Sequence, residues 1–597
     1  MLSGSNKYKR VLTAIAVILL LPITGFAQEK QVSEIKVTGN DHVTFEAIMT
    51  ATGLKTGTAF TEDVVQQAKQ SIEGMGYFQP GVTAGVENVD SGVRLVFNVV
   101  EYPVVKDIKI TGNTVLTTEK LRSTMFTQVN GVLNMNTLRN KDIASIEDSY
   151  AKLGYLAYVT EDAGIDPDTG VLKIPIVEVK VHAINITGNK KTNAHVILRE
   201  MDTKVGHVYN ELTLAKDIQR IYDMGIFELE GTGIEPPKVG PTLDTVDLTI
   251  PVKEKKTGEV SVGLGYSSKQ KLVGQAKASD NNFRGRGQTV NFMWDQGSGG
   301  PSYEAGFYEP WLDSRHTSFG INLYDKLLYR FSNNFLGAQN TGGDTNYDER
   351  RKGGNITLSR PFGKVNRGFL TARSESVVSG LINNPSAISS DGTINSVTSR
   401  LTNDARDSVV DPYIGGYNSY AVELGTAAFT TEAHPASEST FFSKYSFDVR
   451  RYFSKGGARK ELTEQRRRIA FRLMAGSLTG NVPFFEQYFL GGSETLRGYQ
   501  EDRFWGKNMV LASGEYRIPV AQSLTGVVFV DYGDAWGAVS EFRTPDLLPG
   551  FPQHENFRGN LGYGLGIRVI TPIGPLRLDY GFGKEGSRAH FSIGNAF

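Results

Sequence analysis

A glycine-rich loop presents Arg497, the side chain in this sequence with the clearest capacity for specific chemistry. Residues 491–499 read GGSETLRGY, and strand-like sequence lies on both sides of them. If those strands close into a barrel, the guanidinium points into the interior, where its five N–H donors require carboxylate acceptors. We predict that this loop acts as a lock or plug; the alternative is a surface loop with a solvated arginine.

Two acidic residues that follow the loop are the predicted acceptors. Residues 511–518 and 527–534 both alternate apolar with polar or small side chains, as strands with one lipid-facing side do. This alternation turns Glu515 and Asp531 to the inner side. An arginine fork can engage two carboxylates and hold a long loop against a wall. The alternative interpretation is an incidental pairing.

Catalytic constellations are absent from the sequence. It contains no cysteine, its eight histidines are scattered, and it has neither a zinc-type histidine spacing nor a phosphate-binding loop. Ser493 lacks the downstream glycine of a nucleophile elbow, so it is interpreted as a turn residue. We therefore predict a protein that is not an enzyme, with no metal and no cofactor.

Period-two alternation dominates from Thr257 to the last residue. The segments between turns number about sixteen, and an even count suits a closed antiparallel transmembrane barrel. Long connections alternate with short ones, as outer loops and inner turns do in such barrels. One face is apolar and the other polar or small, which predicts a lipid-facing exterior and a wet interior. A soluble β-sandwich would also alternate, but it needs fewer large apolar side chains on one face.

An internal repeat precedes the strands. Residues 35–40, 108–113 and 184–189 read IKVTGN, IKITGN and INITGN, and their asparagines are 73 and then 76 residues apart. Each unit continues with two helical stretches and two further strands, which gives a β-α-α-β-β order. Two helices on one face of a small sheet leave a strand edge open to an extended chain, unless neighbouring units cover it.

The N-terminus and the charge balance restrict the location and the partners. Lys7, Lys9 and Arg10 precede an apolar run at 11–21, so residues 1–27 are predicted to be a secretory signal peptide. No later stretch reaches the roughly 18 apolar residues of a membrane-spanning helix. The formal net charge is zero, which gives no electrostatic footprint for nucleic acid.

The loop at 491–499, and its position between the eleventh and twelfth predicted strands, resembles the conserved arginine loop of the BamA family of outer-membrane assembly factors. The repeats of about 75 residues resemble polypeptide-transport-associated (POTRA) domains. The resemblance implies α+β POTRA domains at 31–102, 103–180 and 181–255, followed by an all-β, 16-stranded antiparallel transmembrane barrel at 257–597. It places the barrel in the outer membrane of a Gram-negative envelope and the POTRA domains in the periplasm. It assigns the lock to Arg497, Gly498 and Tyr499, with Glu515 and Asp531 as acceptors.

The function implied by the resemblance is that of an outer-membrane insertase. Its partners would be unfolded outer-membrane barrel proteins, accessory proteins of the periplasm or lipoproteins, and outer-membrane lipid, with no nucleic acid. The predicted first and last strands, 258–267 and 588–597, contain glycines that weaken strand interiors. We therefore predict a lateral seam between these two strands. Phe597 is expected to point outward, and six small residues are expected to point inward: Ser261, Gly263, Gly265, Ser592, Gly594 and Ala596.

Several alternatives stay open at this stage. Many BamA-like proteins carry five repeats, so three repeats also fit a TamA-like translocation and assembly factor. A two-partner secretion pore would carry two repeats and an N-terminal plug helix, which the sequence lacks. A passive porin is disfavoured by the repeats and the arginine loop, and an outer-membrane enzyme by the missing catalytic constellation.

Overall fold

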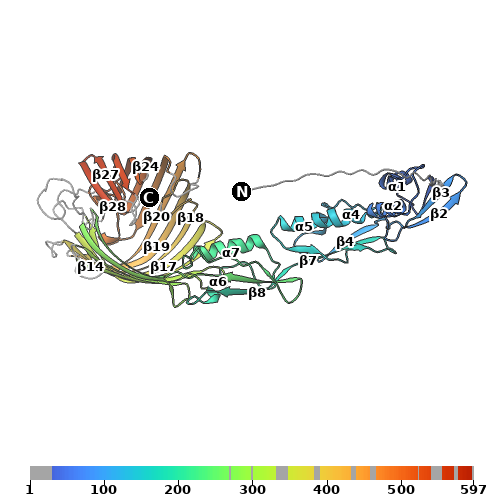
Figure 1. The fold of residues 1–597 in the computed structure, drawn as a ribbon. Helices are drawn as coiled ribbons and strands as arrows, with labels where there is room; N and C mark the ends of the chain where they lie inside the picture. Colours follow the sequence, from blue (N-terminus) through green and yellow to red (C-terminus); the bar gives the residue numbers. More distant parts are fainter. Residues whose placement is uncertain are drawn as a thin grey trace, which may run out of the picture. The chain divides into compact units, whose positions relative to one another are not determined.

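A computed structural model describes residues 30–267, 271–297, 300–330, 347–381, 390–409, 411–431, 438–457, 465–521, 523–538, 554–569 and 576–593 (Figure 1). The predicted signal peptide at 1–27 lies outside these residues. Contacts divide the chain into two compact units. The first contains residues 1–185, 202–217 and 235–249; the second contains 186–201, 218–234 and 250–597.

The first repeat is a two-layer domain of two helices on a three-stranded sheet. Its elements are β1 (Val32–Thr38), α1 (Phe45–Thr52), α2 (Glu62–Gly74), β2 (Thr83–Val89) and β3 (Gly92–Asn98). β3 is central, parallel to β1 and antiparallel to β2. Ile48 and Ile72 from the helices and Leu95 and Phe97 from β3 share one buried core. The predicted β-α-α-β-β order is confirmed, with β1 and β2 at the edges of the sheet.

The second and third repeats follow the same plan; the second has an interrupted second helix and one extra short strand, and the third has a short first helix. The second contains β4 (Asp107–Thr111), α3 (Thr118–Arg122), α4 (Met135–Thr137), η1 (Leu138–Asp142), α5 (Ile143–Ala151), β5 (Ala157–Val159), β6 (Gly164–Ile165) and β7 (Val171–Glu178). The third contains β8 (Lys180–Thr187), α6 (Ala194–Leu198), α7 (Glu211–Asp223), β9 (Lys238–Val239) and β10 (Thr245–Pro251). Their sheet orders are β4-β7-β5, with β6 also on β7, and β8-β10-β9.

The Gly-Asn pair of each repeat forms the same tight turn. Gly39, Gly112 and Gly188 have φ of 87°, 84° and 86°. A Cβ at these positions would lie 2.0 to 2.1 Å from a backbone carbonyl oxygen in, or directly after, the last strand of the repeat, so only glycine fits. The three turns explain why the motif recurs in the sequence.

A glutamate that closes each repeat holds this turn: Glu101, Glu178 and Glu254. Each carboxylate accepts hydrogen bonds from two successive backbone N–H groups of the turn, and Glu101 accepts those of His42 and Val43. Burial raises the pKa of each glutamate, but these hydrogen bonds outweigh burial and hold the pKa below its ordinary value.

Sixteen antiparallel strands form one sheet in sequence order, which confirms the predicted fold class. They are β11 (Gly258–Ser267), β12 (Lys271–Phe283), β13 (Gln288–Gly297), β14 (Gly300–Glu309), β15 (Ser318–Arg330), β16 (Tyr347–Phe362), β17 (Asn366–Leu381), β18 (Ser390–Asp404), β19 (Gly415–Thr431), β20 (Glu438–Ser454), β21 (Arg468–Thr479), β24 (Asn508–Ala521), β25 (Leu524–Trp536), β26 (Asn560–Val569), β27 (Leu576–Gly583) and β28 (Gly586–Ile593). β11 and β28, the ends of this order, lie beside each other. Among the described helices, none is both long and apolar enough to cross a membrane.

The two faces of the strands differ as the alternation predicts. In β25, Val528, Val530 and Tyr532 are 45 to 49% exposed, whereas Phe529 and Asp531 between them are buried. The inner side is not simply wet, however. Apolar side chains of β17 to β25 pack there against the loop that follows β21, in one buried cluster. The prediction of a wet interior is therefore wrong for this region, because the loop brings its own apolar side chains inside.

Candidate functional site

The lumen loop, residues 480–507, joins the eleventh and twelfth strands of the sheet, β21 and β24. It contains the short helix η2 (Phe484–Glu486) and a small antiparallel pair, β22 (Tyr488–Leu490) with β23 (Phe504–Gly506). Leu496 and Tyr499 of the loop belong to the same buried cluster as side chains of the strands. The loop is thus packed against the inner side of the sheet.

Arg497 is almost completely buried and is held by both predicted carboxylates. Its Nε and Nη2 donate to the two oxygens of Asp531 at 2.7 and 2.8 Å, and its Nη1 donates to Glu515 at 2.5 Å. The backbone N–H of Arg497 also donates to Asp531, at 3.2 Å. The guanidinium lies 3.7 Å from the ring centroid of Phe529, so an aromatic face covers it as well.

A second layer of charges surrounds this group. Asp579 on β27 lies 3.6 Å from Arg497 Nη1 and pairs with Arg568 and Arg577. Arg577 donates to the backbone carbonyl of Ser493 at 2.8 Å, so the wall also holds the loop by its backbone. Buried charges persist only when each is paired and hydrogen-bonded, and this network satisfies that requirement for Arg497.

Gly498 and Tyr499 continue the contact with the wall. Gly498 has a φ of 91°, and a Cβ there would lie 2.7 Å from the backbone of Phe582. A Cβ on the strand residue Gly562 would likewise lie 2.0 Å from the carbonyl oxygen of Arg497. The Tyr499 hydroxyl donates to the carbonyl of Leu561 at 3.0 Å. Glycines on both sides therefore let the loop backbone touch the strand backbone.

Glu486 forms a second anchor, which the sequence reasoning missed. Arg351 and Arg373, on β16 and β17, donate to its carboxylate at 3.1 and 3.3 Å. Lys444 on β20 donates to its backbone carbonyl at 2.9 Å. Glu486 is fully buried, so the loop is tied to two different sets of strands, through Glu486 and through Arg497. The signal was one acidic residue inside the apolar run Val482 to Leu490.

The predicted seam residues are described only in part. Ser261 and Gly263 lie on β11 and are exposed, and Gly265 lies on the same strand. Ser592 is buried on β28. The structure describes the strand predicted at 588–597 only as far as Ile593, where β28 ends. Gly594, Ala596 and Phe597 lie outside the described residues. Across the described parts of the two strands, no ladder of paired residues joins β11 to β28.

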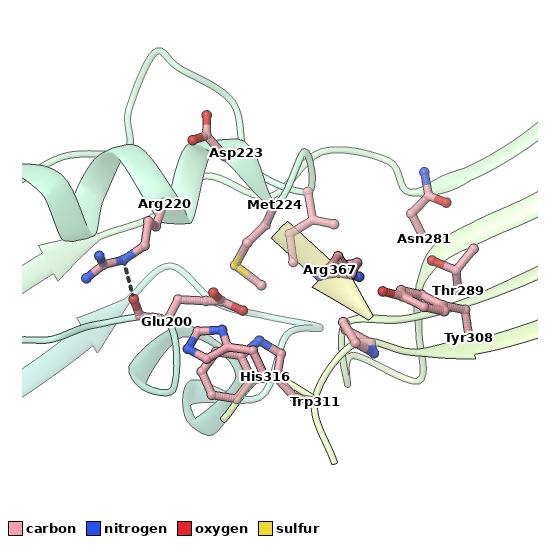
Figure 2. A pocket seen from close by; sticks show the side chains of 13 residues that line it. Glu200, Arg220, Asp223, Met224, Asn281, Thr289, Tyr308, Trp311, His316 and Arg367 are labelled. Carbon is pink, nitrogen blue, oxygen red and sulfur yellow. Dashed lines mark hydrogen bonds between the residues drawn. The ribbon is translucent and has the colours of Figure 1, made fainter. Parts of the chain in front are cut away.

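A pocket of about 410 Å³ lies where the third repeat meets the start of the sheet (Figure 2). Its lining combines the end of α7 and Glu200 after α6 with residues of β12, β13, β14 and β17 and of the segments beside them; it includes Arg220, Met224, Trp311 and His316. Burial raises the pKa of Glu200, although Trp311 and nearby cations oppose that shift. Searched over the described residues, the structure holds no cluster of side chains suited to a metal ion.

The chain is similar to known proteins both in sequence and in structure. The Omp85 superfamily domain matches residues 282–597, and the POTRA family, described as surface antigen variable number repeat, matches residues 31–102, 103–178 and 179–255. The sequence is 27% identical to outer envelope protein 80 of Arabidopsis thaliana, over 92% of this chain and 74% of that protein. It is 26% identical to the outer membrane protein assembly factor BamA of Nitratidesulfovibrio vulgaris, over 76% of this chain and 56% of that protein.

The fold is also similar to a solved structure. BamA from Haemophilus ducreyi lacking POTRA domains 1–3 superposes with a TM-score of 0.57 and 18% identity, over 83% of this chain and all of that one. The sixteen-stranded sheet, with the repeats that precede it, therefore has the same fold as BamA. Since the family domain covers more than half of the sequence, this chain belongs to the Omp85 superfamily.

Proposed function

We propose that this protein is an insertase, which receives unfolded barrel proteins through its three POTRA domains and assembles them into the outer membrane. The observation that carries the proposal is the buried contact of Arg497 with Glu515 and Asp531, inside a sixteen-stranded barrel preceded by POTRA repeats. The three POTRA repeats, for which a passive porin has no evident use, disfavour a passive pore. Membership of the superfamily supports a role in protein insertion or translocation.

The barrel lies in the outer membrane and the POTRA domains lie in the periplasm. A band of large apolar side chains on the outer face of the strands is exposed to the surroundings, as contact with lipid requires. Edge strands such as β1 and β2 offer unpaired backbone groups, so an extended client segment can add to them by β-augmentation.

Assembly then proceeds at the seam between β11 and β28. Three apolar residues of β11, Val260, Val262 and Leu264, are 78 to 81% exposed, which leaves this strand poorly covered. An incoming strand can pair with β11 while the lumen loop keeps the rest of the wall in shape. No covalent bond is made or broken, so we propose no enzymatic group, metal or cofactor.

Reconstitution tests the proposal. The full chain is placed in liposomes, and an unfolded barrel client is added outside together with a protease. We expect the client to become protected and to show the heat-modifiable gel mobility of a folded barrel. Liposomes that contain Arg497→Ala serve as the control. Equal protection in empty liposomes and in liposomes with the wild-type protein would overturn an insertase.

A TamA-like translocation and assembly factor is the second candidate, because the three repeats fit it equally well. Depletion in the source bacterium separates the two. Loss of a central insertase lowers many outer-membrane barrel proteins together, whereas loss of a specialised factor affects few of them. Single-channel conductance separates both from a porin, which would conduct steadily in its resting state.

A further inference from the structure

The long helix of each repeat ends in the same way, at a glycine with a left-handed backbone. Gly76 follows α2, Gly154 follows α5 and Gly225 follows α7, with φ of 77°, 82° and 73°. The carbonyl oxygens at the end of a helix have no partner within it and need donors from elsewhere. We call the carbonyl oxygens of each glycine and of the residue before it the helix-end socket of that repeat.

The first socket is filled by the second repeat. Asn134 donates from Nδ2 to the carbonyl of Met75 at 2.9 Å, and the backbone N–H of Met135 donates to the carbonyl of Gly76 at 2.8 Å. Meanwhile Asn134 Oδ1 accepts the N–H of Thr137, which caps the helix that begins there. The asparagine therefore acts as donor to one repeat and as acceptor within its own.

The second socket is filled in the same way by the third repeat. Asn210 donates from Nδ2 to the carbonyl of Leu153 at 2.8 Å, and the N–H of Glu211 donates to the carbonyl of Gly154 at 2.8 Å. Asn210 Oδ1 accepts the N–H of Thr213 at 2.8 Å. A carboxamide offers a donor and an acceptor on two separate atoms, one for each contact, whereas an ionised aspartate would supply the cap alone.

The third socket is open. A Cβ on Gly76 would lie 2.7 Å from the Asn136 side chain and one on Gly154 would lie 3.1 Å from Asn210, but one on Gly225 meets no described atom within 4 Å. Across the described residues, no donor reaches the carbonyl oxygen of Met224 or of Gly225. The two asparagines that cap described helices in this way, Asn134 and Asn210, already fill the first and second sockets.

The open socket borders the pocket of about 410 Å³ described above. Met224 and Ile226, on either side of Gly225, line this pocket. Figure 2 shows the Met224 side chain there. Asp223 and Arg220 on α7 and Glu200 add charges of both signs around it. The open socket therefore lies beside a cavity that the first strands of the sheet also line and that has polar groups on its border.

We propose that the third helix-end socket docks a partner protein that presents an asparagine at the start of a helix. The asparagine amide would donate to the carbonyl of Met224, and the next backbone N–H to the carbonyl of Gly225. The chain itself fills two sockets of the same geometry in this way, which identifies the chemistry of the occupant.

A cross-linking experiment tests this docking, and the absence of native cysteine makes it specific. The probe is a synthetic peptide of residues 207–223 that carries Leu212→Cys, since the Leu212 side chain lies 2.6 Å from the Cβ position of Gly154 in the filled socket. A lactam between Ala215→Lys and Gln219→Asp, two exposed positions, keeps the peptide helical. The full chain in detergent carries Met224→Cys or, in a second variant, Gly225→Cys.

We expect a disulfide adduct under mild oxidation, formed about tenfold faster than with an Asn210→Asp peptide, because one hydrogen bond to the socket is then lost. The matched control is Met75→Cys at the filled first socket, where the adduct should be rare. An adduct rate that is the same with both peptides, the same at Met75→Cys, or equal for an extended peptide of residues 32–38 that carries Ser33→Cys overturns the proposal. So does the absence of adduct in both socket variants.

Discussion

Arg497 holds Asp531 with two parallel hydrogen bonds, from Nε and Nη2 to the two carboxylate oxygens at 2.7 and 2.8 Å. This fork leaves Nη1 for Glu515, so one side chain ties the lumen loop to two adjacent strands. An ammonium group has no fixed fork and cannot reproduce both contacts at once. The contact therefore depends on the shape of the guanidinium as well as on its charge.

Replacing Arg497 should release the lumen loop. Arg497→Ala leaves two buried carboxylates without their partner, which destabilises the loop contact by roughly 3 to 5 kcal/mol. We expect faster proteolysis at residues 485–505 and poor client assembly, with partial function in Arg497→Lys. Arg451→Ala, at an exposed arginine on β20, is the control. Wild-type protection and activity in Arg497→Ala would contradict the lock.

The second anchor predicts a matching effect at Glu486. Glu486→Gln removes the charge that faces Arg351 and Arg373, so the loop contact should weaken by roughly 3 kcal/mol. Proteolysis near residue 485 measures this loss. Glu494→Gln, which affects a half-exposed side chain, should have little effect.

A double variant shows whether the two anchors act together. If the lumen loop moves as one body, Glu486→Gln adds little once Arg497→Ala has already released it, so the two effects are not additive. Fully additive losses would show that the two ends of the loop are independent.

If the seam must open during assembly, a disulfide between the first and last strands should stop client insertion. One cysteine is placed at Ser261, Gly263 or Gly265 and one at Ser592, Gly594 or Ala596; the pairs are scanned because a disulfide needs a Cβ separation of about 3.5 to 4.5 Å. The cross-linked protein should lose client insertion and recover it on reduction, while its heat-modifiable mobility stays unchanged. Full activity in a demonstrably cross-linked protein would rule out opening at this seam.

The ionisation of Glu200 should make the stability of the third repeat depend on pH. Its folded pKa is raised by burial, so its contribution to stability is present at low pH and is lost as the pH rises through that pKa. At pH 7.5, Glu200→Gln should therefore slow hydrogen exchange in α6 and α7. The effect comes from the neutral amide of glutamine, which carries no penalty for the burial of a charge. Faster exchange in the variant would contradict this assignment.

The repeats should differ in importance. The third repeat is bonded to the barrel, since Asn282 donates to Thr192 at 2.8 Å and Lys191 pairs with Asp280 at 3.0 Å. Deleting 181–255 should therefore abolish client protection in liposomes, and deleting 31–102 should have the mildest effect of the three deletions. Unchanged assembly without 181–255 would make the repeats simple spacers.

The sequence by itself determined the repeats, the sixteen strands and the partners of Arg497. These follow from local rules: only glycine fits the turn at Gly39, and a period of two decides which face of a strand Glu515 and Asp531 occupy. Since both carboxylates lie on the two strands directly after the loop, the pattern of those strands was enough to place them on the inner side.

Only the tertiary structure decided how the rest of the loop is held. Glu486 meets Arg351 and Arg373, which lie 135 and 113 residues earlier in the chain. Their meeting depends on the accumulated register of the intervening strands and on the depth at which the loop packs. For the same reason the lumen proved partly apolar: the apolar side chains of the loop meet those of distant strands in one buried cluster, which the pattern of a single strand does not reveal.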